Sequence, residues 1–250
     1  MSTPNRKTAL ITGATGGIGR SLVKVFHDAG YDVVATDITE KPSDLRCTGY
    51  QKVDLARYAQ DETYATEIND VLLYILKRRL DVLINNAAIQ ILGGADTLTR
   101  HDWHTTLEVN LLAPFLLTQA FLPQVSAAKG SVINIGSIHA RLTKKNFVAY
   151  ATSKAALAGM TRALAVDLGP RVRINAIEPA AIETDMLKMG FEGKADLYAQ
   201  LGSSHPQQRI GQPIEVARLA LAIASGDIEF LHGACISLDG GIGARLFDPT

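Results

Sequence analysis

The stretch TALITGATGGIG, residues 8–19, joins a short apolar run to a glycine-rich loop. Gly13, Gly17 and Gly19 let the backbone turn tightly and approach a ligand closely. A helix that starts directly after the loop would point its N-terminal amides at a phosphate group. The spacing is G-x-x-x-G-x-G, and the alternative is a glycine-rich turn without a ligand. A place between a strand and a helix is nevertheless the context that a nucleotide-binding loop requires, so the stretch predicts an α/β fold with a phosphate site.

Apolar runs and helical patterns alternate along the rest of the chain. Several runs are nearly continuous in Val, Ile and Leu, which is typical of strands buried on both faces. Strands that alternate with helices favour right-handed crossovers and a parallel sheet covered on both sides. The expected strands are residues 8–12, 32–37, 81–85, 131–136, 172–178 and 234–239, and the expected helices include 17–29, 62–79, 110–127, 150–168 and 213–225.

One domain is expected over residues 1–250, because no repeat, low-complexity linker or charged block divides the chain. Residues 184–212 differ most from the rest. They are mixed in character, contain glycine and lie between the last two expected strands. We expect a substrate lid with short helices there.

The composition excludes several classes of partner. Lysine plus arginine number 25, as do aspartate plus glutamate, so the net charge indicates neither nucleic acid nor an anionic membrane. Cys47 and Cys235 lack metal-type spacing, which favours no metal site and a reducing, cytoplasmic location. The N-terminus shows no signal-peptide core. Residues 109–128 are uncharged and long enough to span a bilayer, but Pro114 and Pro123 favour a helix buried in protein, for instance at a subunit interface.

Asp37 ends the second expected strand, where a carboxylate can accept hydrogen bonds from the adenosine ribose hydroxyls of a dinucleotide. A solvated aspartate is the alternative, and the glycine loop favours the ribose interpretation. Enzymes that prefer NADP usually supply a cation for the 2′-phosphate. Residues 14–16 of the loop contain none, Ile38 and Thr39 follow the aspartate, and Lys41 is the nearest cation along the chain. The sequence therefore predicts NAD as the cofactor.

Five motifs occur in order: TGATGGIG (12–19), NNAA (85–88), Ser137, YATSK (150–154) and LDGG (238–241). Together they resemble the single-domain short-chain dehydrogenase/reductase family over about residues 8–243. The resemblance implies a Rossmann-type doubly wound parallel sheet of about seven strands, a bound nicotinamide nucleotide, a small-molecule substrate and a homo-oligomer, either a tetramer or a dimer. The cofactor contacts expected on this basis are Gly13, Thr15, Gly17, Ile18, Gly19, Asp37, Ile38, Asp54, Leu55, Asn86, Ala87, Tyr150, Lys154, Ile182 and Thr184.

Two positions depart from the family pattern. The family's NNAG is NNAA here, with Ala88 last, and Ala180 stands where the family has a glycine after the sixth strand. Ala180 adds a methyl group near the expected nicotinamide and raises a question about the geometry of that turn. Ile182 and Thr184 still match the positions that hold the carboxamide in the family.

Tyr150 and Lys154 lie one helical turn apart, on the same face of an expected helix. A phenol with a pKa of about 10 is a poor base at neutral pH. An ammonium ~5 Å away would favour the phenolate by roughly 3 kcal/mol at an effective dielectric of ~20. Tyr150 is therefore predicted to be the acid/base and Lys154 the group that tunes it, although a surface lysine beside a half-buried tyrosine is an everyday pair.

Two further residues complete the expected catalytic group. Ser137 follows the fifth expected strand at the carboxyl edge, where ligands bind in such sheets, and its hydroxyl could orient the substrate oxygen. Asn110 begins the long uncharged helix, where it could cap or bend that helix. The resemblance implies that Asn110 completes a relay through water to Lys154, and both roles are compatible.

The sequence says less about the substrate than about the cofactor. Gln90 and His139 are expected to face the substrate cleft, and they resemble residues that hold a carboxylate in the family's 3-hydroxybutyrate dehydrogenases. Those enzymes also have a lysine three residues before the tyrosine, where this chain has Phe147. The alternative for His139 is local packing or a local hydrogen bond.

Three classes of function are compatible with these patterns. An NAD-dependent dehydrogenase or reductase that acts on CH–OH and C=O groups is favoured. A non-catalytic, NAD(H)-responsive binding or regulatory protein on the same fold would fit better if Tyr150 or Lys154 were altered, and both are present. Sugar-nucleotide epimerases and dehydratases usually carry an extra substrate domain, for which 250 residues leave little room.

Overall fold

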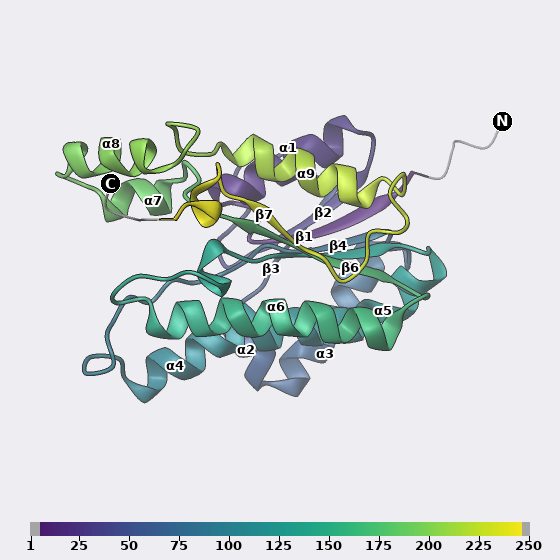
Figure 1. The fold of residues 1–250 in the computed structure, drawn as a ribbon. Helices are drawn as coiled ribbons and strands as arrows, with labels where there is room; N and C mark the ends of the chain where they lie inside the picture. The colour runs from purple at the N-terminus through teal and green to yellow at the C-terminus, as the bar shows by residue number, and fades with distance from the viewer. Residues whose placement is uncertain (1–5, 247–250) are drawn as a thin grey trace.

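The computed structural model describes residues 6–246, in which seven parallel strands form one sheet between two layers of helices (Figure 1). The strand order is β3-β2-β1-β4-β5-β6-β7. The chain thus builds outward from β1 in both directions, which opens a crevice at the carboxyl ends of the central strands. The strands are β1 (Thr8–Thr12), β2 (Asp32–Asp37), β3 (Gly49–Lys52), β4 (Val82–Asn85), β5 (Ser131–Ile135), β6 (Arg173–Pro179) and β7 (Cys235–Leu238).

Helices α1 (Gly17–Asp28) and α9 (Pro213–Ala224) cover one face of the sheet (Figure 1). Their buried side chains, among them Leu22, Phe26 and Val216, pack against β1, β4 and β5. The opposite face is covered by α2 (Leu55–Gln60), α3 (Glu62–Ile75), α4 (Arg100–Leu107), α5 (Ala113–Ala127) and α6 (Val148–Leu168). Leu72 and Phe121 fill that second core. Burial of each such side chain stabilises the fold by roughly 1.5–3 kcal/mol. Because helices cover both faces of the sheet, all five residues of β1 are buried.

The predicted fold class is confirmed, and all six expected strands are present with ends that differ by at most one residue. Strand β3 was not expected, because GYQK is short, polar and only partly buried at the edge of the sheet. Helices α2 and α4 were also missed. Both begin with polar caps rather than with an apolar stripe: Asp54 caps α2, and a capping box of Thr99 and Asp102 opens α4.

The uncharged segment belongs to a longer helix than the expected 110–127. One continuous helix runs from Arg100 to Ala127, and its α-helical parts α4 and α5 flank a π-helical segment, η1 (Glu108–Leu112). Among the described residues this helix alone is long and apolar enough to cross a membrane by length and composition. It packs in the second core through Leu117 and Phe121.

Residues 184–212 form two short helices, α7 (Asp185–Gly190) and α8 (Ala195–Ser204). They lie beyond the end of the sheet, on the left in Figure 1. The two ends of this segment meet in a parallel bridge between Ile182 and Gly211. The Gly211 amide donates to the Ala181 carbonyl at 2.9 Å, and the Glu183 amide donates to the Gly211 carbonyl at 2.8 Å. The segment is therefore tied to the body of the fold at this bridge, and a second time near its end, where the Gln207 amide donates to the Gly240 carbonyl at 3.2 Å.

Candidate active site

At two positions of the glycine loop, no residue other than glycine fits. Gly13 has a φ of +63°, and a Cβ there would lie 2.7 Å from the Ala87 Cα. A Cβ on Gly19 would collide with the Gly13 carbonyl oxygen. The loop leads into α1, whose N-cap is Gly16 and whose first turn has no side-chain cap. The first amides of α1 are thus available to an anion, and the loop lets it approach the backbone, as the diphosphate of a dinucleotide requires.

Asp37 is fixed against the glycine loop. Its Oδ2 accepts hydrogen bonds from the Thr15 amide at 2.9 Å and from the Thr15 hydroxyl at 2.8 Å, and its Oδ1 accepts from the Ile38 amide at 2.8 Å. A carboxylate oxygen has two acceptor sites, so Oδ1 can still accept a ribose hydroxyl. Beside it, the side chain of Ile38 is 58 % exposed and offers an apolar surface.

The cation closest to this loop was not the expected Lys41. Arg20, in the first turns of α1, donates through Nε to the Thr15 carbonyl at 3.0 Å. Its guanidinium also forms an ion pair with Asp44 at 2.8 Å. Arg20 directly follows the glycine loop in the sequence, and the first turn of α1 brings its side chain back onto that loop. Its pairing with Asp44 means that a second negative charge on a cofactor would have to compete with a carboxylate.

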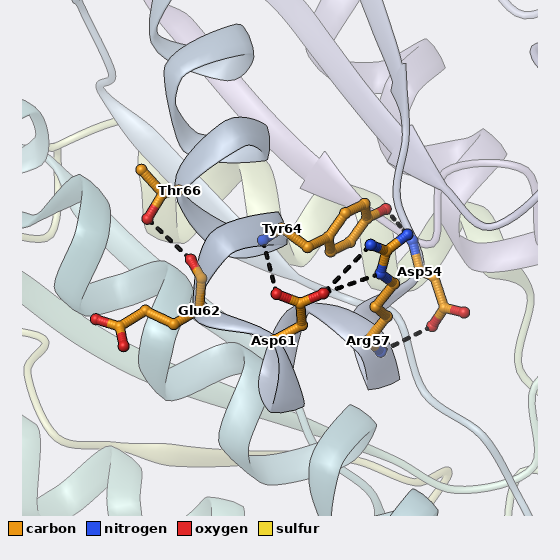
Figure 2. A network of polar contacts seen from close by, with 6 residues as sticks. All are labelled: Asp54, Arg57, Asp61, Glu62, Tyr64 and Thr66. Atoms are coloured by element: carbon orange, nitrogen blue, oxygen red, sulfur yellow. Dashed lines mark hydrogen bonds and ion pairs between the residues drawn. The ribbon is translucent and has the colours of Figure 1, made fainter.

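Asp54 and Leu55 follow β3 and lie beside the end of β2, since the Val53 amide donates to the Asp37 carbonyl at 2.8 Å. The Asp54 carboxylate caps α2 by accepting from the Ala56 amide and from the Arg57 amide, and Figure 2 shows the second of these bonds. Tyr64 donates no bond to that carboxylate; its hydroxyl accepts from the Asp54 amide at 3.1 Å.

Arg57 extends the same network. Its guanidinium lies over the Tyr64 ring and pairs with Asp61, which caps α3 (Figure 2). Through the bonds of Asp54 with Tyr64 and with the first amides of α2, the network holds the backbone at residues 53–55 in place. The Asp54 carboxylate is thereby committed mainly to the helix cap.

Asn86 and Ala87 lie against the glycine loop. The Asn86 side-chain amide donates to the carbonyls of Thr12 and Gly13 at 2.9 and 3.0 Å. The Thr12 hydroxyl accepts from the backbone amides of Asn86 and Ala87, both at 3.0 Å. Thr12 was missing from the expected site, although its place as the last residue of the buried first strand could have marked it.

Thr184, in the chain that follows β6, lies against the glycine loop. A Cβ on Gly17 would lie 2.9 Å from the Thr184 Cγ2, so the two residues are in close contact. Thr184 also caps α7 through its hydroxyl, and Ile182 is buried. Ala88 and Ala180 do not have a positive φ, so neither alanine strains its turn. The question raised by these two departures is therefore answered for the backbone.

Ser137 and Tyr150 meet at the carboxyl edge of β5. Ser137 is 7 % exposed and caps a short 3₁₀ turn, η2 (Ile138–Ala140), by accepting from the His139 amide. A hydrogen bond with Ser137 lowers the pKa of the Tyr150 phenol, but burial acts more strongly and the net pKa is raised. The expected net lowering by Lys154 is thus wrong for the protein alone. Burial disfavours the phenolate more than the charge estimate allowed.

Lys154 is only 2 % exposed, and it donates to the Ile135 carbonyl at 2.8 Å. Burial lowers the pKa of its ammonium to about 8. Its Nζ lies 5.8 Å from the centre of the Tyr150 ring. A lysine with a single carbonyl partner in an apolar environment is costly to stability, which is typical of functional sites rather than of surface lysines.

Asn110 lies within η1, inside the long helix rather than at its start. Its Oδ1 accepts from the Ile89 amide at 2.9 Å, and its Nδ2 donates to the Ile89 carbonyl at 2.9 Å and to the Ser153 hydroxyl at 3.1 Å. Ser153 in turn donates to the Tyr150 carbonyl at 2.7 Å. A π-helical turn at such a residue is frequent at functional sites. Asn110 thus joins the loop after β4 to the start of α6, and Ser153 is a member of the site that sequence reasoning missed.

His139 packs beside Tyr150. Its ring stacks on Phe147 with centroids 4.4 Å apart, meets the Tyr150 ring edge-on at 5.7 Å, and its Nδ1 lies 3.1 Å from the Thr143 hydroxyl. Burial, with a smaller contribution from the Lys144 charge, lowers the pKa of His139 to about 4. The imidazole is therefore uncharged at neutral pH and could supply a hydrogen bond but no charge to a substrate. Gln90, partly buried in the loop after β4, has no side-chain hydrogen bond within residues 6–246.

The expected site residues therefore gather along one edge of the sheet. The glycine loop, Asp37 and the N-terminus of α1 suit a dinucleotide, while a phenol, a hydroxyl and a buried ammonium adjoin one another where the loops after β4, β5 and β6 converge. Within the described part of the chain, no group of three or more His, Cys, Asp or Glu side chains could hold a metal ion. This arrangement can bind a nicotinamide cofactor and move a proton to or from an oxygen.

Known proteins share this architecture. A family model described as enoyl-(acyl carrier protein) reductase matches residues 13–243. An NAD-dependent glycerol dehydrogenase of Listeria innocua is 31 % identical over 94 % of this chain and 93 % of its own length. A 3-oxoacyl-(acyl-carrier-protein) reductase of Thermotoga maritima is 32 % identical over 94 % of this chain and 97 % of its own. The structure of a Thermoplasma acidophilum aldohexose dehydrogenase matches with a TM-score of 0.90 and 30 % identity over 98 % of this chain and 97 % of that one.

Proposed function

Because the chain belongs to the short-chain dehydrogenase/reductase family, we propose that it is an NAD(H)-dependent oxidoreductase that interconverts a secondary alcohol and a ketone. The observation that carries the proposal is an arrangement of three groups: the Tyr150 phenol forms a hydrogen bond with the buried Ser137 hydroxyl, and the buried Lys154 ammonium lies 5.8 Å from the centre of the Tyr150 ring. A nicotinamide cofactor, when bound, would supply or accept the hydride. The chain's own residues would bind the substrate and move the proton.

Tyr150 is proposed to carry that proton. In the reduction of a ketone, its hydroxyl would donate to the carbonyl oxygen; in the oxidation of an alcohol, it would take the hydroxyl proton. The raised pKa of Tyr150 keeps the phenol protonated at neutral pH, ready for reduction. Ser137 would hold the substrate oxygen beside it, and the charge of Lys154 would favour the phenolate when the proton leaves.

The cofactor is proposed to lie along the carboxyl edge, with its diphosphate at the free amides of α1 and its adenosine ribose at Asp37. Ile38, Asp54 and Leu55 would flank the adenine, and Asn86 and Ala87 would line the middle of the cleft. Ile182 and Thr184 would hold the nicotinamide end, which the contact of Thr184 with Gly17 supports.

We predict a clear preference for NAD(H) over NADP(H). A 2′-phosphate would lie beside the Asp37 carboxylate, and two like charges at roughly 4 Å repel by ~4 kcal/mol at an effective dielectric near 20. Half of that after screening is more than tenfold in affinity. The double variant Asp37→Ser with Ile38→Arg should move the preference toward NADP(H), as measured by kcat/KM for both nucleotides.

The matched control for that experiment is Asp28→Ser. This variant removes a carboxylate from the far end of α1, where Asp28 pairs with Lys24, and it should leave the preference unchanged. A wild-type protein that prefers NADP(H), or a double variant with an unaltered NAD(H) preference, would show that Asp37 does not face the ribose.

A panel of secondary alcohols and ketones, followed by NADH absorbance, tests the activity itself. The panel should include hydroxy acids beside their esters, because Gln90 and His139 are proposed to line the substrate cleft. Since His139 is uncharged at neutral pH, we expect it to favour the acid over the ester only weakly. No turnover with any member of a broad panel, in either direction, would refute the proposed activity.

The chain is proposed to act as one domain in a cytoplasmic homo-oligomer, with residues 184–212 as a lid over the substrate. An apolar groove on α4, α5 and α6 supports the assembly, because its lining includes Leu111, Phe115 and Met160. We expect light scattering after size exclusion to give two or four times the chain mass of 26.8 kDa. A particle of the chain mass at micromolar concentration would contradict the assembly but not the activity.

A further inference from the structure

The turn that carries Ser137 is followed by an exposed segment, residues 141–146, with one strong tie to the sheet. Arg141 leaves this segment and donates through Nε to Glu178 Oε2 at 3.0 Å. The same guanidinium also donates to the Ser237 hydroxyl on β7. Arg141 thus bridges the loop after β5 to both of the following strands, across a sequence distance of 37 residues to Glu178.

Glu178 lies beneath the same turn. It sits in β6 with its side chain 2 % exposed, and its carbon chain packs under Gly136, where an added Cβ would lie 3.2 Å from the Glu178 Cγ. The Gly136 amide also donates to the Ile177 carbonyl at 2.7 Å. Gly136, immediately before Ser137, therefore packs against the Glu178 side chain. Arg141, at the other end of the turn, bonds to the carboxylate of the same residue.

We propose that Arg141 and Glu178 form a clamp around residues 136–141 that keeps the Ser137 hydroxyl aligned with Tyr150, so that both act as positioning residues for the proton transfer. The proposal rests on the proposed function for its catalytic consequence. Within the turn, the amides of Ala140 and Arg141 donate to local carbonyls, those of Ser137 and Ile138, and His139 packs on α6 through Phe147 and Tyr150. The Gly136 amide ties the start of the turn to β6, and Arg141 supplies the tie to the sheet at its other end.

The charge arrangement explains why the pair should be sensitive to substitution. The buried carboxylate of Glu178 has its charge balanced by the half-exposed Arg141, whose side chain is 52 % exposed. Removal of one partner leaves a buried charge without compensation, whereas neutralisation of both partners removes the charge altogether. In Arg141→Gln, the carboxylate is expected to turn toward water and to carry the Gly136 backbone with it.

Hydrogen exchange of the backbone amides is the first test, because it does not depend on turnover. Arg141→Gln should speed exchange in the peptide that spans residues 136–147 and leave the rest of β5 and α6 unchanged. The control is Lys145→Gln, which removes a charge from the same segment; Lys145 has no hydrogen bond or ion pair within residues 6–246. Unchanged exchange in Arg141→Gln, or an equal increase throughout the protein, would overturn the clamp.

Turnover is the second test. Arg141→Gln is expected to lower kcat by about tenfold, a loss of the size that misplacement of a reacting group produces, with little change in the Kd for NADH. Glu178→Gln combined with Arg141→Gln should recover at least part of that loss, and Arg141→Lys should retain more activity than Arg141→Gln. Equal kcat in wild type and Arg141→Gln would overturn the positioning role. A wild type without turnover on the panel would instead refute the proposed function, and hydrogen exchange would still decide the clamp.

Discussion

Tyr150→Phe is expected to lower turnover by roughly 10²-fold or more, the usual scale for loss of a general acid or base, and to leave NADH binding intact. The substitution removes one oxygen from a buried ring and keeps the packing against His139 and Phe147. Steady-state rates on any accepted substrate, together with the Kd for NADH from fluorescence, provide the measurement.

Tyr58→Phe is the matched control for this prediction. Tyr58 is also buried, at 1 % exposure, and its hydroxyl donates to Asn69 of α3 at 2.8 Å, outside the proposed catalytic group. Its loss should cost about 1 kcal/mol of the free energy of unfolding and no turnover. If Tyr150→Phe kept near-normal turnover, or if Tyr58→Phe lost as much, Tyr150 would not be the proton carrier.

Lys154→Met is expected to abolish most turnover and yet to stabilise the fold. The fall in the Lys154 pKa from 10.5 to about 8 corresponds to a cost of about 3 kcal/mol for holding the buried ammonium at neutral pH. Methionine has a similar shape and carries no charge, so this cost disappears. The Ile135 carbonyl, however, loses its hydrogen bond from Lys154, which destabilises the variant by about 1 kcal/mol. A net gain of about 1–2 kcal/mol should raise Tm by several degrees.

The pH dependence of that gain has a definite sign. In the unfolded chain, the lysine stays protonated up to about pH 10.5, whereas in the folded protein it stays protonated only up to about pH 8. The penalty is therefore fully present below pH 8 and disappears as the pH rises through 8 toward 10.5. The Tm difference between variant and wild type, measured by calorimetry, should be largest near pH 7 and smaller near pH 9.5. A variant less stable than wild type at pH 7 would show that Lys154 supports the fold rather than burdening it.

The central fold could be predicted from the sequence because the composition of its buried strands and of its glycine loop reflects where these segments lie in the fold. The runs around Leu10, Val34 and Ile133 are apolar because both faces of those strands are covered, and such runs are visible without a structure. Strand β3 and helices α2 and α4 could not be predicted, because their boundaries are set by contacts with other parts of the fold and by polar caps. GYQK pairs with β2 only once the sheet exists, and the capping residues of α4 lie in a polar segment without an apolar stripe.

The candidate site was predictable to a similar extent. Tyr150 and Lys154 are neighbours on one helix, so their spacing alone indicates a pair. Asn110 bonds to residues 21 and 43 positions away, and its contacts with Ile89 and Ser153 follow from a π-helical turn that no periodicity shows. The pKa of Tyr150 was misjudged for a related reason: a charge at a known spacing can be estimated from sequence, whereas burial by the whole fold cannot.

The bridge between Ile182 and Gly211 makes the segment between them an exchangeable module. Since its two ends are already paired, the sheet does not depend on how long the intervening chain is, and a doubling of loop length costs only about 0.6 kcal/mol in closure entropy. Insertions, deletions or replacements within residues 185–203 could thus accumulate while β6, α9 and the proton-transfer residues stay in place. With residues 184–212 as the proposed substrate lid, the choice of substrate could change in evolution while the proton-transfer residues keep their positions.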